Sequence, residues 1–386
     1  ENGVAETLHD LEKLGYKGMY EGEYILGLVK GNKVITLEPG SQFELSIKAQ
    51  KHIKDIELEY LDFLKDLLPI LESKGQQIMA VGYHPETKIE EIKLLPKKRY
   101  DFMFNYFKTA GSMAHNMMKG TSALQISLDY GSEEDYRKKF RIANALSPVV
   151  FALFDNGLYF QGEEYEGHNI RARIWNNCDN QRSGIVTNAL SDDFSFKKYA
   201  EYILNVPPIL MAKDGDFVPT GELLVKDVFD PEHYKTEELE HLLTMVFPDV
   251  RTKRYIEIRM MDSVPIPLSL SAIALWTGIF YNDIALNKVY DYIKYVTIED
   301  VKKTKLEMQE KGLLAKLGDK TLLEIAKHVV QLAKEGLSEE DVKYILPLEG
   351  MIEAEKNPYQ ITKDRLYMGK KKALQWTVLN LFEELE

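Results

Sequence analysis

Four segments of the chain alternate polar and apolar residues with a period of two, which is the pattern of a strand whose two faces differ. In each segment every second side chain is apolar, and the side chains between them are acidic, amide, hydroxyl, guanidinium or aromatic. The segments are residues 40–47, 123–130, 169–175 and 254–262. We predict that they form strands of one curved antiparallel sheet whose apolar face packs against helices.

The polar faces of these segments contain no lysine, although lysine is abundant elsewhere in the chain. An antiparallel sheet with one face in water would give the same alternation and is common. A face in water, however, usually includes lysine. Carboxylate and amide oxygens are ligands for hard cations, and guanidinium groups suit carboxylates and phosphates. The composition therefore favours a shared ligand site, where Mg²⁺ and ATP would balance charges that are costly to bury alone.

Helical periodicity is found in two long segments of the first half of the chain. Residues 47–75 end at Gly75, which is a typical C-cap. Residues 132–157 begin with Ser132 three positions before Asp135, which is a capping pattern. Both segments are predicted to be helices.

The second half of the chain is predicted to be mainly helical. Residues 266–281 are almost wholly apolar, but they contain serines and are shorter than the ~20 residues of a membrane span. We therefore expect a buried helix there and no membrane association. Beyond about residue 298, successive helical segments each begin with an N-cap residue. The predicted fold is α+β, with one domain at residues 1–297 and a helical C-terminal region at residues 298–386 packed on it.

Charge and cysteine content limit the classes of partner. The net charge of the 386 residues is −12, whereas binding to nucleic acid needs a basic patch. We expect only small-molecule partners, and a monomer or homodimer. The single cysteine, Cys178, cannot form an intramolecular disulfide, which fits a reducing compartment and predicts a cytoplasmic location.

Carboxylates and an arginine supply the candidate chemistry. Glu38 and Glu44 flank a Pro-Gly turn that could bring both carboxylates toward one cation, although the turn taken alone slightly favours a hairpin with solvated glutamates. Glu257 and Arg259 are two residues apart, so they share one face of their strand. Together these groups would serve phosphoryl transfer, which depends on positioning and on charge neutralisation.

Five sequence blocks resemble the plant and bacterial branch of the glutamate–cysteine ligases. These enzymes are carboxylate–amine ligases related to glutamine synthetase. The resemblance extends from about residue 24 to residue 282, with the blocks in the same order and at similar spacing. The blocks are TLEPGSQFELS (36–46), GYHP (82–85), TSALQISLD (121–129), RARIWNNCDNQRSG (171–184) and RYIEIRMMDS (254–263).

The resemblance implies a fold and a reaction. The fold is a strongly curved antiparallel sheet, as in glutamine synthetase, with helices on its convex side and ATP, two or three Mg²⁺ ions and glutamate on its concave side. In the implied reaction, the γ-carboxylate of glutamate is phosphorylated by ATP, and the amine of cysteine then displaces phosphate. The product is γ-glutamylcysteine, which is the first intermediate of glutathione synthesis.

The resemblance also implies residue roles. The metal-ligating carboxylates are similar to Glu38, Glu44 and Glu257. Glu257 and Arg259 are the implied catalytic pair, with Arg259 on the transferred phosphate and therefore also a nucleotide contact. Further nucleotide contacts are implied at Gln125 and Ser127. The implied substrate-binding residues are Thr121, Arg171, Arg173, Trp175 and Arg182, with Asp179 in the same loop.

The chain departs from the family pattern at two places. The family usually opens with a strand of closely spaced glutamates, whereas this sequence opens on a segment that resembles the helix after that strand. Gly120 stands where plant members often have an arginine. Two alternatives therefore remain beside a glutamate–cysteine ligase: a related ligase with a different amine acceptor, and a catalytically degenerate relative that binds ATP.

Overall fold

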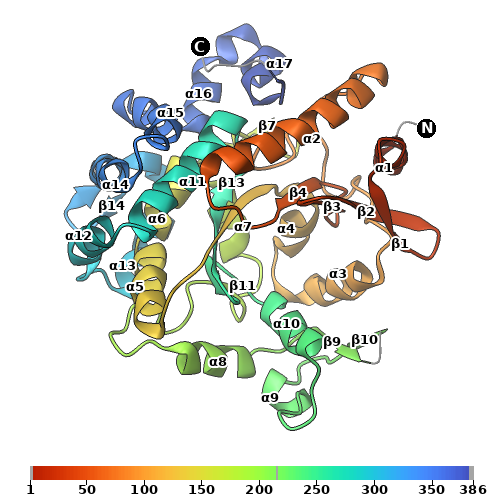
Figure 1. The fold of residues 1–386 in the computed structure, drawn as a ribbon, viewed down its shortest axis with the longest axis horizontal. Coiled ribbons are helices and arrows are strands. Elements are labelled where there is room, and N and C mark those ends of the chain that lie inside the picture. The colour runs from red at the N-terminus through yellow and green to blue at the C-terminus, as the bar shows by residue number, and fades with distance from the viewer. Residues whose placement is uncertain (1–2, 214–215, 382–386) are drawn as a thin grey trace.

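The computed structural model describes residues 3–213 and 216–381, and its N-terminal part is built on a four-stranded antiparallel sheet with the strand order β1-β2-β3-β4 (Figure 1). A core of leucine, isoleucine and phenylalanine side chains joins this sheet to two helices, and it includes Leu11, Leu28 and Phe63. The elements are α1 (Val4–Glu12), β1 (Lys17–Glu21), β2 (Tyr24–Lys30), β3 (Lys33–Leu37), β4 (Phe43–Ile47) and α2 (Ile53–Ser73).

A second sheet has three antiparallel strands in the order β12-β13-β5. Its apolar face, which includes Ile126, Ile256 and Ile258, packs against three helices within the largest core of the protein. Every residue of β13 is buried, so its polar face is covered as well. The elements are β5 (Ala123–Leu128), β12 (Val250–Thr252), β13 (Ile256–Asp262), α5 (Glu133–Ala145), α6 (Ser147–Leu153) and α11 (Ile266–Phe280).

Shorter helices and strand pairs connect and flank the two sheets. The helices are α3 (Lys98–Ala110), α4 (Ala114–Gly120), α7 (Ile170–Asn176), α8 (Phe196–Leu204), α9 (Val225–Val228), α10 (Thr236–Thr244) and α12 (Asp283–Ile293). The short strands are β6 (Tyr159–Phe160), β7 (Glu163–Glu164), β8 (Ser183–Gly184), β9 (Leu210–Lys213), β10 (Asp216–Pro219) and β11 (Phe247–Pro248).

The C-terminal region is helical, as predicted, apart from one small hairpin. Its helices pack beside α6 and α11, and their side chains belong to the same core as β13 (Figure 1). Whether residue 297 marks a domain boundary stays a prediction. The elements are α13 (Ile298–Lys311), β14 (Lys316–Leu317), β15 (Lys320–Thr321), α14 (Leu322–Gly336), α15 (Val342–Glu353), α16 (Pro358–Asp364) and α17 (Lys370–Ala373), with 3₁₀ turns at Gly312–Leu314, Leu366–Met368 and Gln375–Thr377.

The predicted α+β fold is confirmed, and three of the four predicted strands are present as β4, β5 and β13. The strand predicted at residues 169–175 is wrong, because these residues form α7. Both a period of two and a helical period place Ile170 and Ile174 on one face, so this short apolar pattern cannot separate strand from helix. The four segments also do not form one hydrogen-bonded sheet, since β4 belongs to the first sheet and β5 and β13 to the second.

The predicted helix signals are present, with two changes of boundary. The helix predicted at residues 47–75 begins only at Ile53, as α2, because residue 47 ends strand β4. Gly75 follows α2 in the left-handed region, with φ of 66°. The Ser132 hydroxyl accepts a hydrogen bond from the backbone N–H of Asp135 at the start of α5. The single helix predicted at residues 132–157 is instead two helices, since α5 ends before Leu146 and Pro148 lies in the first turn of α6. Among the described residues, no helix combines the length and apolar character that crossing a membrane requires.

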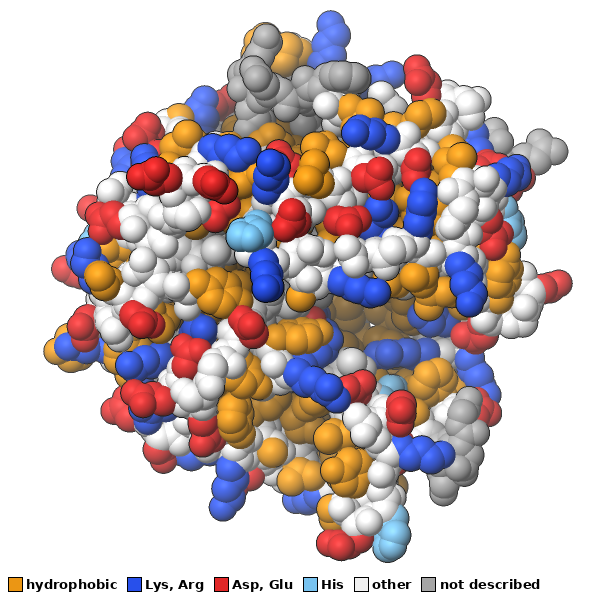
Figure 2. Space-filling model, in the orientation of Figure 1, with side chains coloured by type: hydrophobic (Ala, Val, Ile, Leu, Met, Phe, Trp, Pro, Cys, Tyr) orange, Lys and Arg blue, Asp and Glu red, His pale blue; other side chains and the backbone are white. Residues whose placement is uncertain are grey.

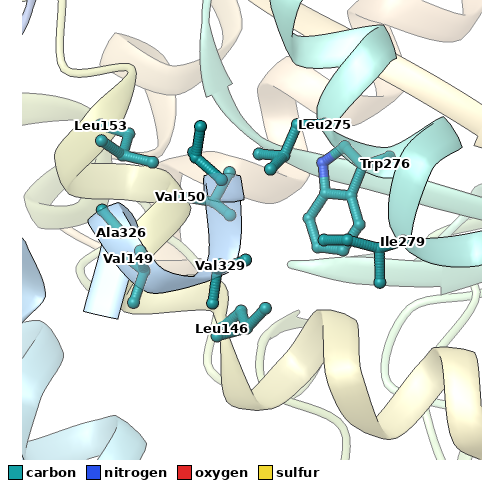
Figure 3. Close-up of a pocket in the computed structure, with 10 residues that line it drawn as sticks. Leu146, Val149, Val150, Leu153, Leu275, Trp276, Ile279, Ala326 and Val329 are labelled. Atoms are coloured by element: carbon teal, nitrogen blue, oxygen red, sulfur yellow. The ribbon is translucent and has the colours of Figure 1, made fainter. Parts of the chain in front are cut away.

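The main core is closely packed where α6, α11 and α14 meet. Figure 3 shows a cavity of about 10 Å³ between them, lined by apolar side chains that include Val149, Leu275 and Val329. Trp276 is fully buried beside it. A space of this size holds at most one water molecule, so the cavity is a packing defect and not a ligand site.

Two glycines allow α11 and α14 to approach each other closely. A Cβ atom at Gly278 would lie 2.1 Å from the backbone oxygen of Ala333. A Cβ atom at Gly336 would lie 2.0 Å from the backbone oxygen of Gly278. Backbone oxygens cannot move aside as a side chain can, so any larger residue would push the C-terminal helices away from the second sheet.

We predict that Gly278→Ala lowers the free energy of unfolding by about 1–3 kcal/mol, because its methyl group overpacks this contact. Gly350→Ala is the matched control, since Gly350 lies in helix α15 and a Cβ atom there would meet no neighbouring atom within 4 Å. The control is expected to stabilise the protein by about 0.4–1 kcal/mol. Urea denaturation measures both changes, and a neutral Gly278→Ala would contradict the close approach.

Candidate active site

The centre of the candidate site is a β-bulge in β13. Pairing with β5 advances from Ile258–Ile126 to Met261–Leu124, so β13 uses one residue more than its partner between these two pairs. A bulge bends the strand and changes the direction of its side chains, and bulges are frequent next to active sites. As a consequence, Asp262 lies on the same face as Glu257 instead of the opposite one.

Glu257 is buried on the polar face and is bound by three cationic side chains. Its Oε2 accepts hydrogen bonds from Nε of Arg251 at 2.7 Å and from Nη1 of Arg259 at 2.9 Å. Nζ of Lys253 lies 3.3 Å from Oε1. Burial alone would raise the pKa of Glu257, but Arg259, Arg251 and Lys253 hold it well below its usual value. Glu257 is therefore ionised at all physiological pH values.

Arg259 is held by both its side chain and its backbone. Its guanidinium donates to Glu257 and, from the same Nη1, to Oε1 of Gln125 at 3.2 Å. Its backbone N–H donates to the carbonyl of Asp249 at 3.0 Å, and its carbonyl accepts from Nη2 of Arg171 at 2.9 Å. Burial lowers the pKa of Arg259 to about 10, which leaves the side chain cationic near neutral pH. The structure thus fixes one positive charge in a defined direction.

Gln125 and Ser127 lie on β5 beside this pair, as the strand prediction required. Ser127 is paired directly opposite Glu257, and both Gln125 and Ser127 are exposed on this face. The face of β5 therefore remains open next to the buried charges of β13, so a ligand can approach from this side.

The hairpin between β3 and β4 brings Glu38 and Glu44 close enough for their charges to interact. Glu38 follows β3, and its backbone N–H donates to the carbonyl of Gln42. The Gln42 amide donates to the carbonyls of Met118 and Thr121, which fixes the hairpin against the end of α4. The turn therefore places a half-buried carboxyl group and an exposed one beside each other.

The pKa of Glu38 is raised by burial and by the nearby Glu44 carboxylate. Burial, and then the charge of Glu44, raise the pKa of Glu38 to about 7. Lys97, Arg99 and Arg259 oppose the rise. Because Arg259 belongs to the second sheet and Glu38 to the first, the polar groups of the two sheets share one electrostatic environment.

Helix α7 separates the substrate-binding candidates that a strand would have grouped together. Arg171 and Trp175 are four residues apart and share a buried helix face, with the guanidinium 5.8 Å from the ring centre. Arg173 lies on the other side, is exposed and donates to the hydroxyl of Tyr165. The prediction that Arg173 lies on one face with Arg171 and Trp175 is therefore wrong.

Arg182 and Thr121 already have local partners. Nε of Arg182 donates to Asp179 at 2.6 Å, and its Nη atoms donate to backbone carbonyls and to the hydroxyl of Tyr106. Arg182 has no exposed surface, so its side chain stabilises the surrounding loops and is not accessible to a ligand. The Thr121 hydroxyl donates to the carbonyl of Met117, so only its acceptor capacity is free.

Several charged residues of the site were missed by the strand pattern. Arg251 comes from β12, and Lys97 and Arg99 stand at the start of α3, where no alternating pattern marks them. Strict alternation from Glu257 would place Asp262 on the apolar face, because alternation does not include the bulge. Of these residues, only Arg251 could have been suspected from the sequence, because it lies just before the matched RYIEIR block.

The donor set fits a cation only in part. Among residues 3–213 and 216–381, no three His, Cys, Asp or Glu side chains form a group ready to hold a metal ion. Magnesium, however, is commonly held by one or two carboxylates together with substrate phosphates. Glu38 and Glu44 supply such a pair, and their mutual repulsion is the feature that a cation would relieve. Glu257 is instead occupied by arginines.

Cations outnumber carboxyl groups around this site, which suits an anionic ligand. Figure 2 shows a hollow near α3 on this face, with Lys and Arg side chains at its opening. The cationic residues are Lys97, Arg99, Arg171, Arg251, Lys253 and Arg259, and the carboxyl groups are Glu38, Glu44, Asp249, Glu257 and Asp262.

Comparison with known proteins decides the family. A family model described as "Glutamate-cysteine ligase family 2 (GCS2)" matches residues 3–365. The chain belongs to glutamate–cysteine ligase family 2. The resemblance inferred from the five sequence blocks is therefore confirmed, and membership places the chain among the ligases.

Plant members of glutamate–cysteine ligase family 2 resemble the chain over most of its length. "Glutamate--cysteine ligase, chloroplastic" of Nicotiana tabacum is 32% identical over 348 residues, which cover 88% of the chain and 67% of that protein. The protein of the same name from Solanum lycopersicum is 34% identical, with 89% of the chain and 66% of the relative covered. The chain thus spans about two thirds of the length of these relatives.

The predicted cytoplasmic location is wrong. These two relatives, and others from Brassica juncea, Medicago truncatula and Arabidopsis thaliana, are all named chloroplastic. The prediction rested on Cys178, and a single buried cysteine shows only that the chain needs no internal disulfide. Such usage is compatible with more than one compartment.

We predict a pH-dependent effect of Glu38→Gln on stability in the absence of divalent cations. Because the pKa of Glu38 is raised in the folded state, its contribution to stability is present below pH 4.5 and is lost as the pH rises through about 7. The variant side chain stays neutral at every pH. At pH 8 its free energy of unfolding should therefore exceed that of the wild type by on the order of 1–3 kcal/mol. The difference should shrink toward pH 5.

Denaturation at both pH values tests this expectation. Glu91→Gln is the control, since Glu91 is exposed and should change nothing at either pH. An equal effect of Glu38→Gln at pH 5 and pH 8 would contradict the raised pKa.

Proposed function

We propose that the chain catalyses the ATP-dependent joining of L-glutamate and L-cysteine. Family membership supports the ligase chemistry, and the buried Arg259–Glu257 pair supports phosphoryl transfer at this place. The γ-carboxylate of glutamate attacks the γ-phosphate of ATP, giving γ-glutamyl phosphate and ADP. The cysteine amine then attacks the acyl carbon, phosphate leaves, and γ-glutamylcysteine is formed. Phosphorylation is needed because a free carboxylate is a poor acyl donor.

Arg259 is the proposed catalytic arginine. Glu257 and two backbone hydrogen bonds hold the Arg259 guanidinium in a fixed orientation. It therefore needs no reorganisation when negative charge shifts during transfer. Glu257 fixes the direction of this guanidinium, and its second oxygen, next to Lys253, remains available to other ligands. Gln125 and Ser127 border the same space on β5 and are proposed nucleotide contacts.

Magnesium is proposed at the β3–β4 hairpin. Glu38 and Glu44 would hold the ion together with phosphate oxygens, and the bound ion would neutralise charge on the nucleotide. The raised pKa of Glu38 supports this assignment, because two neighbouring carboxyl groups without a cation repel each other. Two or three ions, with Glu257 as a ligand, are what the family resemblance implies, and this number stays a prediction.

We further propose that the two sheets together form the curved glutamine synthetase-like surface. The charge of Arg259 from β13 acts on Glu38 beside β3, which supports a common space between the two polar faces. Arg171 and Trp175 would border the glutamate end of this space, with the guanidinium directed at a carboxylate. Within the described part of the chain, Nε and Nη1 of Arg171 have no hydrogen-bond partner, so the guanidinium retains donors for such a group.

The test is an assay for ADP and phosphate with ATP, Mg²⁺, glutamate and cysteine. We expect release that requires both amino acids, with γ-glutamylcysteine as product. Replacement of cysteine by other amines identifies the acceptor. A chain that hydrolyses no ATP with any pair of amino acid and amine would refute the proposed function.

We predict that Arg259→Ala lowers kcat about 100-fold or more, while KM for glutamate changes far less, since the charge is needed chiefly during transfer. Arg254→Ala is the matched control. Arg254 lies just before β13, is exposed and pairs with Glu240 at the surface, so its loss should leave both constants near the wild-type values. A rise in KM for glutamate as large as the fall in kcat would contradict the role of Arg259.

We also predict that the two arginines of α7 differ. Arg171→Ala should raise KM for glutamate by about tenfold or more, because a buried charge-assisted contact contributes about 1.5–3 kcal/mol. Arg173→Ala should change KM less than about threefold, since Arg173 is exposed and points away. Steady-state kinetics at saturating ATP measure both, and equal effects would contradict the helical placement.

A further inference from the structure

We propose that Lys305 of the C-terminal region is a positioning residue for Arg259 and acts through Asp249. This inference rests on the proposed function, because it assigns a role in the same reaction. Lys305 and Asp249 are not among the proposed catalytic or binding residues, and Lys305 lies outside all five matched blocks.

The first link is a buried ion pair. Nζ of Lys305 on α13 lies 2.7 Å from Oδ2 of Asp249, and the two residues are only 4% and 5% exposed. The ammonium also lies 4.8 Å from the ring centre of Phe151 on α6. Removing one partner of such a pair leaves an uncompensated buried charge, so the position of Asp249 depends on Lys305.

The second link is the backbone of Asp249. Its carbonyl accepts the N–H of Arg259 at 3.0 Å, and its own N–H donates to the carbonyl of Gly184 at 2.8 Å. The residue therefore connects the edge of the short β8–β11 pair to the bulge of β13. The direction in which Arg259 leaves the strand is set at this bulge, where the regular strand pairing with β5 is interrupted.

The third link is on the other side of Arg259. Its carbonyl accepts a hydrogen bond from Nη2 of Arg171. Burial lowers the pKa of Arg171, and the charges of Asp262 and then Asp249 oppose this shift. The Asp249 carboxylate thus pairs with Lys305 and also acts on the charge of Arg171, while the Asp249 backbone bonds to Arg259 and Gly184. Loss of the Lys305 charge would change the balance at both hydrogen bonds of the Arg259 backbone.

A role in stability alone is the competing explanation, because any buried ion pair contributes to folding when one partner is lost. The two roles differ in what they predict for turnover. A positioning residue changes kcat beyond what unfolding explains, whereas a structural residue changes only the amount of folded protein.

The experiment compares four variants with the wild type: Lys305→Met, Lys305→Arg, Lys303→Met and the double variant Asp249→Asn with Lys305→Met. We expect Lys305→Met to lower kcat about tenfold or more, while KM for ATP and glutamate changes less than about threefold. Lys305→Arg keeps the charge and should recover most of kcat. Lys303→Met is the control, since Lys303 is an exposed lysine on the same helix.

The double variant separates the two roles. It removes both charges of the Lys305–Asp249 pair, so neither partner is left unpaired and its Tm should return toward the wild-type value. Under the proposal its kcat stays low, because no ion pair to α13 holds Asp249 in place. Recovery of kcat together with Tm would overturn the proposal, as would wild-type kcat in folded Lys305→Met.

Hydrogen exchange gives a measurement that does not depend on activity. Backbone amides in residues 254–262 include the N–H of Arg259 that bonds to Asp249. They should exchange faster in Lys305→Met than in Lys303→Met, at a temperature where both are folded. Unchanged exchange would refute the inference. Absence of ligase activity in the wild type would refute the proposed function and leave the exchange result to be judged separately.

Discussion

The structure depends on the buried interaction between the Glu257 carboxylate and the guanidinium groups of Arg251 and Arg259. Burying any one of these charges alone would cost several kcal/mol, and together they offset one another only while their geometry is kept. The bulge in β13, the short strand β12 and the Gln125 amide all serve this geometry. An arginine with fixed direction is the result, and it is the property that a phosphoryl-transfer site requires.

The C-terminal helices share the main core with the second sheet. Their apolar side chains share one core with β5 and β13, and the glycines of α11 and α14 bring two backbones into direct contact. Helix α13 also contributes Lys305, which pairs with Asp249 next to the bulge of β13. Removing the C-terminal region would therefore expose the underside of the second sheet and also leave Asp249 unpaired.

Much of the site could be predicted from sequence because a strand pattern constrains which side chains meet. Glu257, Arg259, Gln125 and Ser127 share a face because alternation is a direct consequence of strand geometry. The pattern failed at Arg173, since seven residues with apolar groups four apart satisfy both periods. It also failed at Asp262, because a bulge adds a residue that no local propensity announces. Contacts such as Lys305 with Asp249 join residues far apart in sequence, and periodicity holds no information about them.

The hairpin with Glu38 has a consequence for the energetics of cation binding. A carboxyl group whose pKa stands at about 7 holds a proton in a large share of molecules at neutral pH. A divalent cation bound at the proposed site would have to displace that proton, so its uptake would be coupled to proton release into the buffer. The apparent affinity of the cation then strengthens with rising alkalinity, and the heat of binding measured in buffers of different ionisation enthalpy would differ in proportion to the protons expelled.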